Sequence, residues 1–315
     1  MIMELIISEN ISQPINQMGQ SKNHLSYVLI TAAKNEEDYI RGTIESVAAQ
    51  NITPELWVIV SDASTDKTDE IIKEYADKYS FIKYVRATDQ AERNFASKAF
   101  AINIGYKHIR NVEYNFIGIL DADVTFQPDY IETIMKKFAE DPKLGIAGGI
   151  FYDVYNGKRH KVNPSVHSVR GAVQLFRREC YEDVNGMMPL RKGGVDTFAE
   201  ISARKYGWKV KTFFDAEVLH HRCTGTSSMN LFQHKYRQGI VEHSLGYHPL
   251  YQAVKCCIRI FEKPYIIGAA LRFAGYWNSY LKKETPTVPE DFFKFIRHEQ
   301  KLRLRKVFFF KNKAF

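Results

Sequence analysis

Short, mostly apolar runs alternate with amphipathic segments through the first 120 residues. The runs are residues 27–33, 56–61, 81–86 and 115–120. Such runs are typical of strands that are buried on both faces of a sheet. Between them, apolar side chains recur at helical spacing, as in Ile40, Ile44 and Val47. This alternation predicts an α/β fold with a mostly parallel sheet that is flanked by helices.

The same patterning predicts the elements that connect and extend this sheet. Asn35 is placed to cap the first helix. Further helices are expected from about residue 94 to residue 108 and from residue 129 to residue 139. Residues 144–154 are predicted to form a strand, in which the adjacent glycines 148 and 149 would allow another backbone to approach closely.

The pattern changes near residue 225, where the alternation of strands and helices stops. We therefore expect an N-terminal segment over residues 1–25, an α/β domain over 26–225 and a helical extension over 226–315. The extension contains 16 basic and 6 acidic residues, a net charge of +10, whereas the whole chain carries +8. Aromatic residues among these cations favour contact with an anionic membrane surface. Nucleic acid is not expected as a partner, because the basic excess lies apart from the carboxylates described below.

Targeting signals and cysteine usage indicate the expected compartment. The chain has four cysteines without regular spacing, so a disulfide framework is not expected. The first residues lack the basic region and cleavage site of a secretory signal. Residues 264–281 form the longest apolar stretch, but Arg272 interrupts it, so it would lie on a membrane rather than cross it. We expect a cytoplasmic protein that is peripheral on the inner face of the cell membrane.

Three carboxylates follow predicted strands. Asp62 follows residues 56–61, and Asp121 and Asp123 follow residues 115–120. Ligands bind beyond the carboxyl ends of strands in parallel sheets. The Asp121 and Asp123 pair offers hard oxygen ligands for Mg²⁺ or Mn²⁺, and such an ion would neutralise a diphosphate. The alternative is that these residues only cap the segments that follow them.

Five motifs together resemble those of the inverting family 2 glycosyltransferases of GT-A fold, of the type that builds bacterial cell-surface polysaccharides. The motifs are ITAAKNEEDYIRGTIESVAAQ, VIVSDASTDKTDEI, KAFAINIGY, LDADVTFQPDYI and DTFAEISARKYGWKV. This resemblance implies that Asp62 holds the donor base, usually uracil, and that Asp121 contacts the ribose or the metal. It also implies that Asp123 is the principal ligand bridging Mn²⁺ or Mg²⁺ to the diphosphate of a UDP-sugar.

The resemblance also suggests residues that complete the donor site. They are Ala32, Asn35, Glu36, Arg93 and Lys98. Arg93 and Lys98 lie near a helix start, which itself attracts phosphate, although both could simply be solvated helix charges. One departure is that Asp62 stands alone between Ser61 and Ala63, where the family commonly has two acidic residues, so base recognition can differ.

An inverting transfer needs a general base for the acceptor hydroxyl. Asp196 matches the family's base, eleven residues before Gly207. Glu200 lies one helical turn later and is either the competing base, a ligand of the acceptor hydroxyl, or an exposed carboxylate near Arg204. His220 or His221 is expected to complete the metal shell, and His220 is preferred.

These expectations combine into one functional hypothesis. The chain is predicted to be a metal-dependent transferase that moves a sugar from a nucleotide-sugar to a hydroxyl of a lipid-linked or polysaccharide acceptor. One alternative is a non-catalytic scaffold with the same fold that binds a nucleotide-sugar or a membrane. A nucleotidyltransferase is disfavoured, because the first strand is not followed by a Gly-rich phosphate loop.

Overall fold

The computed structural model describes residues 25–87, 96–155, 157–162, 166–222 and 230–309. Residues 1–24 of the predicted N-terminal segment lie outside the described residues, as do Arg93 and Cys223. The strands are β1 (Tyr27–Ala33), β2 (Leu56–Ser61), β3 (Ile82–Arg86), β4 (Phe116–Leu120), β5 (Val124–Phe126), β6 (Leu144–Tyr155), β7 (Lys158–Lys161), β8 (Val173–Arg177) and β9 (Lys209–His220). The helices are α1 (Ile40–Ala48), α2 (Thr68–Lys78), α3 (Ser97–Ile109), α4 (Tyr130–Glu140), α5 (Arg178–Asp183), α6 (Val195–Lys205), α7 (Leu231–Ser244), α8 (Pro249–Ile258), the 3₁₀ turn η1 (Arg259–Phe261), α9 (Tyr265–Leu281) and α10 (Glu290–Phe309).

The described strands form one sheet in the order β3-β2-β1-β4-β8-β6-β9-β5, with β7 paired to β6. The first four strands in this order are parallel, as are β6 and β9. β8 runs antiparallel to β4 and β6, and β5 antiparallel to β9. Antiparallel neighbours need no crossover helix between them. The sheet is therefore mixed, and its parallel part ends at β4.

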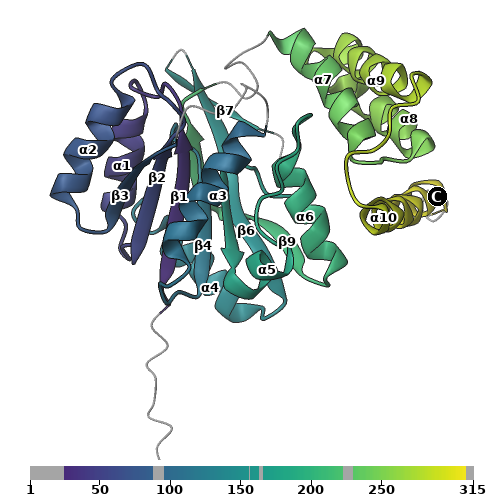
Figure 1. Ribbon diagram of the computed structural model, residues 1–315. Coiled ribbons are helices and arrows are strands. Elements are labelled where there is room, and N and C mark those ends of the chain that lie inside the picture. The colour runs from purple at the N-terminus through teal and green to yellow at the C-terminus, as the bar shows by residue number, and fades with distance from the viewer. Residues whose placement is uncertain (1–24, 88–95, 156, 163–165, 223–229, 310–315) are drawn as a thin grey trace, which may run out of the picture.

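Helices cover both faces of the sheet, as the sequence pattern predicts. Ile40 and Ile44 of α1 join the core on one face, together with buried side chains of α2 and α4. Ala99 and Ile102 of α3 join the core on the other face, with side chains of α5 and α6. Figure 1 shows α1 and α2 at one side of the sheet and α3 across the front of it.

The predicted N-cap at Asn35 is wrong. Helix α1 begins at Ile40 after Tyr39, so Asn35 lies in the preceding loop. Its φ of 55° is in the left-handed region, which asparagine tolerates better than most residues. Its side-chain Oδ1 instead accepts a hydrogen bond from the Thr65 backbone N–H at 2.8 Å. The loop is thus tied to the segment after β2 rather than to its own helix.

The predicted close approach at the glycine pair of β6 is confirmed. A Cβ at Gly149 would collide with the carbonyl oxygen of Ala216 on β9. A Cβ at Gly148 would lie 2.8 Å from the carbonyl oxygen of Val173. Both positions accept only glycine without local movement, because a neighbouring carbonyl oxygen blocks each added Cβ, and at Gly148 the Val169 side chain blocks it as well.

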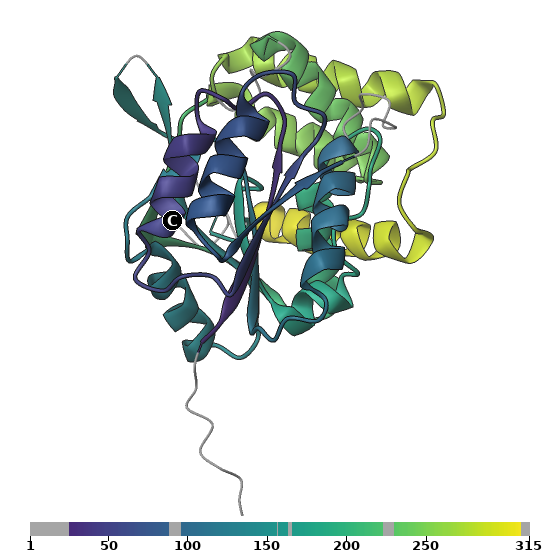
Figure 2. The ribbon, with the colours of Figure 1, turned by 60° about the vertical axis from the view of Figure 1, so that its left-hand side comes forward.

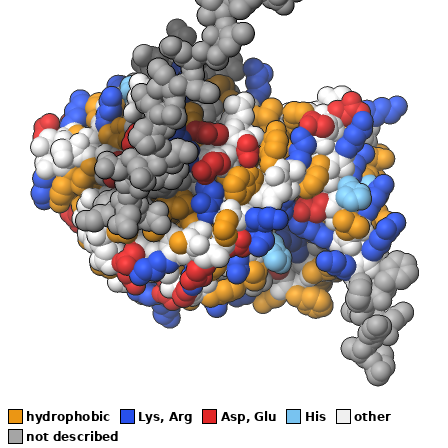
Figure 3. Space-filling view, turned by 90° about the horizontal axis from the view of Figure 1, so that it is seen from below, with side chains coloured by type: hydrophobic (Ala, Val, Ile, Leu, Met, Phe, Trp, Pro, Cys, Tyr) orange, Lys and Arg blue, Asp and Glu red, His pale blue; other side chains and the backbone are white. Residues whose placement is uncertain are grey.

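The C-terminal helices pack against α6. A third core cluster joins Phe198 of α6 to Tyr276 of α9 and Phe292 of α10. Arg204 of α6 also pairs with Glu299 of α10, with Nε to Oε1 at 2.8 Å. Figures 1 and 2 both show α7, α8 and α9 grouped together, with α10 running separately from them. The face in Figure 3 shows Lys and Arg side chains among hydrophobic ones over this part of the molecule. Within the described residues, no helix has the length and apolar character that crossing a bilayer requires.

Candidate active site

The carboxyl ends of β2 and β4 place Asp62, Asp121 and Asp123 along one edge of the sheet. β1 lies between these strands and is parallel to both. The Asp62 backbone N–H donates to the carbonyl of Ala33 at 2.8 Å, which fixes the segment after β2 against the end of β1. The Asp62 carboxylate lies 3.2 Å from the Lys34 ammonium. Lys34 is not among the residues that the sequence motifs predict for the site, although it follows the first apolar run directly.

The loop after β1 holds the other residues expected near the donor. Ala32 is half-buried in β1 and pairs in register with Val60. The backbone N–H of Asn35 donates to Ser64 Oγ at 3.1 Å, and that of Glu36 donates to Thr68 Oγ1 at 2.7 Å. These bonds fold the β1 loop onto the β2 loop, so residues from the first two motifs share one wall of the site.

Asp123 is buried and only partly satisfied. One carboxylate oxygen, Oδ2, lies 3.5 Å from His220 Nε2 and 3.7 Å from Arg222 Nε. The other oxygen, Oδ1, is buried without a hydrogen-bond partner. Burial raises the pKa of Asp123, but the hydrogen bond and charge of His220, followed by the charge of Arg222, lower it more. The net shift is downward, so the carboxylate stays ionised.

His220 faces the carboxylates and His221 faces away. His220 Nδ1 lies 2.9 Å from Asp153 Oδ1, and its Nε2 faces Asp123. Burial lowers the pKa of His220, but Asp123 and Asp153 together raise it to about 9. His221 Nε2 instead lies 2.8 Å from Thr125 Oγ1. The opposite orientations follow from the alternation of side chains along an extended backbone.

Asp153 and Arg222 also lie at the site, although no sequence motif predicts them. Asp153 stands directly beside His220 in the parallel register of β6 and β9. Arg222 pairs with Glu36 through both terminal nitrogens of its guanidinium, Nη2 at 2.5 Å and Nη1 at 3.2 Å. Burial raises the pKa of Glu36 to about 7, Arg222 opposes this rise and Asp123 adds to it. Glu36 is thus linked through Arg222 to Asp123.

Lys98 joins the two halves of the site. It lies in the first turn of α3 and forms an ion pair with Asp121. Its ammonium is also 3.4 Å from the carbonyl oxygen of Gly171. Asp196 and Asp123 lie within electrostatic reach of the same ammonium. Lys98 therefore connects the carboxylates after β4 with the side of the site that α6 forms.

Asp196 and Glu200 occupy different environments although both lie on α6. Asp196 is half-exposed in the first turn, and a Cβ at Gly171 would lie 2.7 Å from its Oδ2. Glu200 is only 4% exposed and accepts hydrogen bonds from the Val169 N–H at 2.6 Å and the Ser168 hydroxyl at 2.9 Å. Burial, with a contribution from Asp196, raises the pKa of Glu200 to about 8. The expectation of an exposed carboxylate at this position is wrong.

The chemistry of these side chains fits a hard divalent cation. The unpartnered Oδ1 of Asp123 is an available anionic oxygen, the ligand type that Mg²⁺ and Mn²⁺ prefer. Among the described residues, no group of three or more His, Cys, Asp or Glu side chains is arranged to hold a metal ion. His220 could ligate only after releasing its proton, because a protonated imidazole has no free lone pair.

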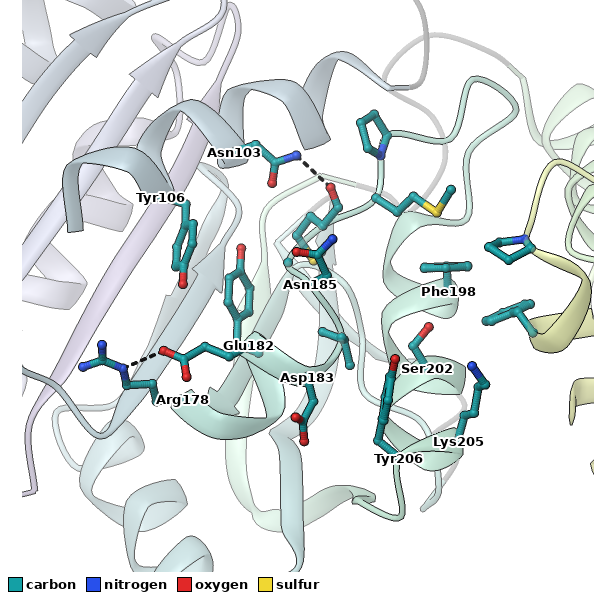
Figure 4. A pocket seen from close by; sticks show the side chains of 18 of the residues that line it. Asn103, Tyr106, Arg178, Glu182, Asp183, Asn185, Phe198, Ser202, Lys205 and Tyr206 are labelled. Atoms are coloured by element: carbon teal, nitrogen blue, oxygen red, sulfur yellow. Dashed lines mark hydrogen bonds and ion pairs between the residues drawn. The ribbon is translucent and has the colours of Figure 1, made fainter. Parts of the chain in front are cut away.

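A separate cavity of about 1000 Å³ lies between α3, α5, α6 and the start of α10 (Figure 4). Its charged side chains largely pair with one another, as Arg178 does with Glu182. Asn103 donates to the carbonyl of Met187 at 2.9 Å and so holds the loop that borders the cavity. None of the carboxylates at the sheet edge lines this cavity, so it is not the candidate active site.

Residues 28–225 match the model of Glycosyl transferase family 2, so the chain belongs to this family. This range contains every residue described above for the candidate site. The fold is the GT-A fold, as the family resemblance implies.

Individual relatives agree with this assignment. The chain is 32% identical over 226 residues to the poly-beta-1,6-N-acetyl-D-glucosamine synthase of Staphylococcus epidermidis, which covers 69% of this chain and 48% of that protein. The chain thus spans about half the length of this curated relative.

Two solved structures share the fold at low sequence identity. The mannosyltransferase PcManGT from Pyrobaculum calidifontis, in complex with GDP-Man and Mn²⁺, aligns with a TM-score of 0.53 and 18% identity, covering 90% of this chain and 81% of that one. TarS 1-349 of S. aureus aligns with a TM-score of 0.51 and 15% identity, covering 82% of this chain and 73% of that one. At these identities the likeness shows the fold alone.

Proposed function

We propose that this protein is a metal-dependent inverting glycosyltransferase. It would move a sugar from a nucleotide-sugar to a hydroxyl of a lipid-linked or polysaccharide acceptor. The observation that carries the proposal is that Lys98 pairs with Asp121 at the edge of the sheet and lies within electrostatic reach of Asp123 and Asp196. This arrangement supports a site in which donor-binding carboxylates and a general base share one cation, Lys98.

Donor binding would use the first two loops and the residues after β4. Asp62, held by Lys34, is the proposed contact for the base, with Ala32 and Asn35 forming the adjoining wall. Asp123 is the proposed metal ligand, Asp121 contacts the metal or the ribose, and His220 lies beside them. A bound Mg²⁺ or Mn²⁺ would neutralise the negative charge of the departing diphosphate.

UDP-sugars are the first donors to test. A structure of TarS 1-349 contains UDP-GlcNAc, whereas that of PcManGT contains GDP-Man, so fold neighbours differ in the base. The single Asp62 between Ser61 and Ala63 is the residue whose surroundings would decide between them.

Asp196 is the proposed general base. It would remove the proton of the acceptor hydroxyl while that oxygen attacks the anomeric carbon from the face opposite the diphosphate. The bond from the anomeric carbon to the phosphate oxygen breaks, and the nucleoside diphosphate leaves with the electron pair. Glu200 is a weaker candidate, because its oxygens already accept hydrogen bonds from Val169 and Ser168.

The two parts of the chain would have different tasks. We propose that residues 26–225 form the catalytic domain and that residues 226–315 hold it on the cytoplasmic face of the membrane. The support is the net charge of +10 in the extension and its exposed apolar residues, including Phe261 and Ile266. Cations and apolar side chains together are the combination that binds anionic bilayers.

A donor panel tests the proposal. The full chain would be incubated with UDP-, GDP- and dTDP-sugars, with Mn²⁺ or with a chelator, and nucleotide release would be measured. Metal-dependent release from one nucleotide class is expected. Donor-dependent thermal stabilisation without release, with membrane extracts supplied as acceptors, would instead favour a non-catalytic scaffold. The absence of both nucleotide release and thermal stabilisation with every donor would contradict the proposal.

A further inference from the structure

The irregular segment formed by residues 168–172 is fastened to α6 at its first two residues. The segment leads into β8 and belongs to no helix or strand. Glu200 accepts hydrogen bonds from the backbone N–H of Val169 at 2.6 Å and from the Ser168 hydroxyl at 2.9 Å. Glu200 and Val169 are both buried. Hydrogen bonds are stronger in the interior than in water, so this end of the segment has a defined position.

Two further side chains hold the same residues. Thr212 Oγ1 donates to the carbonyl of Ser168 at 2.6 Å, and Gln174 Nε2 donates to the carbonyl of Val169 at 3.2 Å. The Val169 side chain belongs to the core cluster that contains α3 and would collide with a Cβ at Gly148. The start of the segment is therefore fixed by the interior of the domain, although it lies outside regular secondary structure.

The end of the segment contacts the candidate active site. A Cβ at Gly171 would lie 2.7 Å from Asp196 Oδ2 and 2.8 Å from Asp196 Cβ, so the Gly171 backbone packs directly against the candidate base. The carbonyl oxygen of Gly171 also accepts a hydrogen bond from Lys98 at 3.4 Å. The carbonyl of Ala172 accepts the backbone N–H of Asp121 at 2.8 Å. The segment thus lies between the candidate base and the residues assigned to the donor.

This contact limits the orientations that Asp196 can adopt. Asp196 is half-exposed in the first turn of α6, and a half-exposed side chain can occupy more than one staggered rotamer. The Gly171 backbone fills the space on one side of the carboxylate and excludes rotamers that point there. A general base acts only within hydrogen-bond reach of the proton that it removes, so the rotamer of Asp196 bears directly on the reaction.

We propose that Glu200 is a positioning residue for the transfer reaction. It fastens residues 168–172, and through Gly171 this segment holds Asp196 in the orientation that receives the acceptor proton. Glu200 itself touches neither substrate. Because the same segment binds the Asp121 backbone, it also keeps the base at a fixed separation from the donor carboxylates. This inference rests on the proposed transferase function and adds a residue to that same site.

Two substitutions of Glu200 separate positioning from proton transfer. Glu200→Gln keeps a carbonyl oxygen for the Val169 N–H, and its amide can donate to the Ser168 oxygen. Burial raises the pKa of Glu200 to about 8, so a neutral amide is a close replacement at pH 7. Glu200→Ala removes both hydrogen bonds.

Nucleotide release would be measured with the most active nucleotide-sugar of the donor panel, Mn²⁺ and membrane extract as the acceptor. Glu200→Ala is expected to lower the turnover number by about tenfold to a hundredfold, the size of effect that a small displacement of a catalytic group produces. Glu200→Gln should remain close to the wild type. The KM for the donor should be unchanged in both variants, because the donor contacts stay in place.

Three further variants test the path from Glu200 to Asp196. Gly171→Ala should lower the turnover number without removing a hydrogen bond, because its methyl group would displace the Asp196 carboxylate. In the Asp196→Asn background, Glu200→Ala should cause no further loss, since the two residues act through one group. Ile109→Ala, buried at the far end of α3, is the control for lost stability. It should lower the melting temperature and leave the turnover number of the folded protein unchanged.

Hydrogen exchange of the amides of residues 168–172 measures the fastening without catalysis. Exchange should be faster in Glu200→Ala by about tenfold, as expected for the loss of one buried hydrogen bond. Glu200→Gln should exchange as the wild type does. Mass spectrometry of peptides that cover the segment gives this comparison on the full chain.

The outcomes that overturn the proposal are distinct. Wild-type turnover in Glu200→Ala would exclude positioning by Glu200, and an inactive Glu200→Gln with wild-type exchange would make Glu200 the base. A loss in Glu200→Ala that persists in the Asp196→Asn background would assign Glu200 to the stability of the fold alone. Failure of the transferase proposal is visible separately, as absent nucleotide release by the wild type while the exchange of Glu200→Ala and Glu200→Gln still differs.

Discussion

Asp123 has one carboxylate oxygen facing two cationic side chains and one oxygen without a partner. An ionised carboxylate in this position supplies charge as well as a ligand atom, and an amide would supply only the atom. Metal binding at this site is therefore expected to depend on the negative charge of Asp123 more than on the size and shape of its side chain.

Asp123→Asn is expected to abolish most of the Mn²⁺-dependent part of UDP affinity, because the amide cannot balance a divalent cation against a diphosphate. Calorimetric titration of UDP with and without Mn²⁺ measures this part directly. Asp129→Asn, an exposed aspartate before α4, is the control. Unchanged Mn²⁺-dependent affinity in Asp123→Asn would show that the metal binds elsewhere.

Asp196→Asn is expected to lower the turnover number by about two to four orders of magnitude, the usual contribution of a positioned general base. Donor affinity should stay near that of the wild type, since Asp196 is assigned to the acceptor side. Steady-state kinetics and UDP titration of the same preparation separate the two effects. Near-normal turnover of Asp196→Asn, with an inactive but folded Glu200→Gln, would exchange the two roles.

Glu200 predicts a pH dependence of stability. Its pKa of about 8 in the folded protein exceeds the ordinary value of 4.5, so the folded chain retains a proton that the unfolded chain releases between these values. This contribution to stability is complete below the unfolded value and is lost as the pH rises through the folded value. Glu200→Gln removes the titration and should still accept the Val169 N–H.

The melting temperature of wild type minus that of Glu200→Gln should therefore fall as the pH rises from about 6 to about 9. Thermal unfolding followed by circular dichroism measures this difference. Glu70→Gln, an exposed α2 carboxylate, should show no such trend. A constant difference across the range would mean that Glu200 is already ionised in the folded protein.

At the scale of elements, glycines set the contact between α7 and α9. A Cβ at Gly239 would collide with the carbonyl oxygen of Arg272 and lie 2.6 Å from the Tyr276 backbone nitrogen. A Cβ at Gly275 would collide with the carbonyl oxygen of Tyr236. The two helices therefore meet backbone to backbone, which brings the Arg272 and Glu242 side chains together.

Gly239→Ala is expected to lower the free energy of unfolding by about 1–3 kcal/mol, because overpacking forces the helices apart. Gly42→Ala is the matched control on α1, where the added methyl group would meet only Thr125 Cγ2 at 3.8 Å. That variant should be neutral or slightly stabilising, since alanine favours helix over glycine. Denaturant titration of both variants checks the difference, and equal stabilities would contradict the close contact.

At the scale of the whole molecule, α6 connects the sheet to the extension. Its inner face joins the sheet core through Ala199 and Ala203, and Phe198 stacks on Phe292 of α10 with ring centroids 4.4 Å apart. Asp196 lies in the first turn of the same helix. The candidate base is therefore positioned by both parts of the chain.

Sedimentation with vesicles tests the role proposed for the extension. The full chain is expected to pellet with anionic vesicles at low salt and to pellet less at high salt, because salt screens the charge contribution while the apolar contribution remains. Vesicles of zwitterionic lipid should bind less protein at every salt concentration. Equal recovery in the supernatant with both kinds of vesicle at low salt would make a soluble acceptor the better proposal.

Local periodicity was enough to predict most of the sheet and its ligand edge. The apolar runs became β1 to β4, and Asp62, Asp121 and Asp123 follow the strands after which they were expected. The start of α1 could not be predicted from Asn35, because that residue bonds to the Thr65 backbone thirty positions away. Exposure of Glu200 was likewise misjudged, since helical spacing does not reveal that residues 168 and 169 cover it.

The sequence by itself determined the family, the strand ends that carry the carboxylates and the basic character of the extension, because these depend on residues that are close together in the chain. Only the tertiary structure decided which groups meet. Arg222 reaches Glu36 across 186 positions, and Asp153 meets His220 only through the register of β6 and β9. Such contacts depend on the order in which strands assemble, and local spacing carries no record of that order.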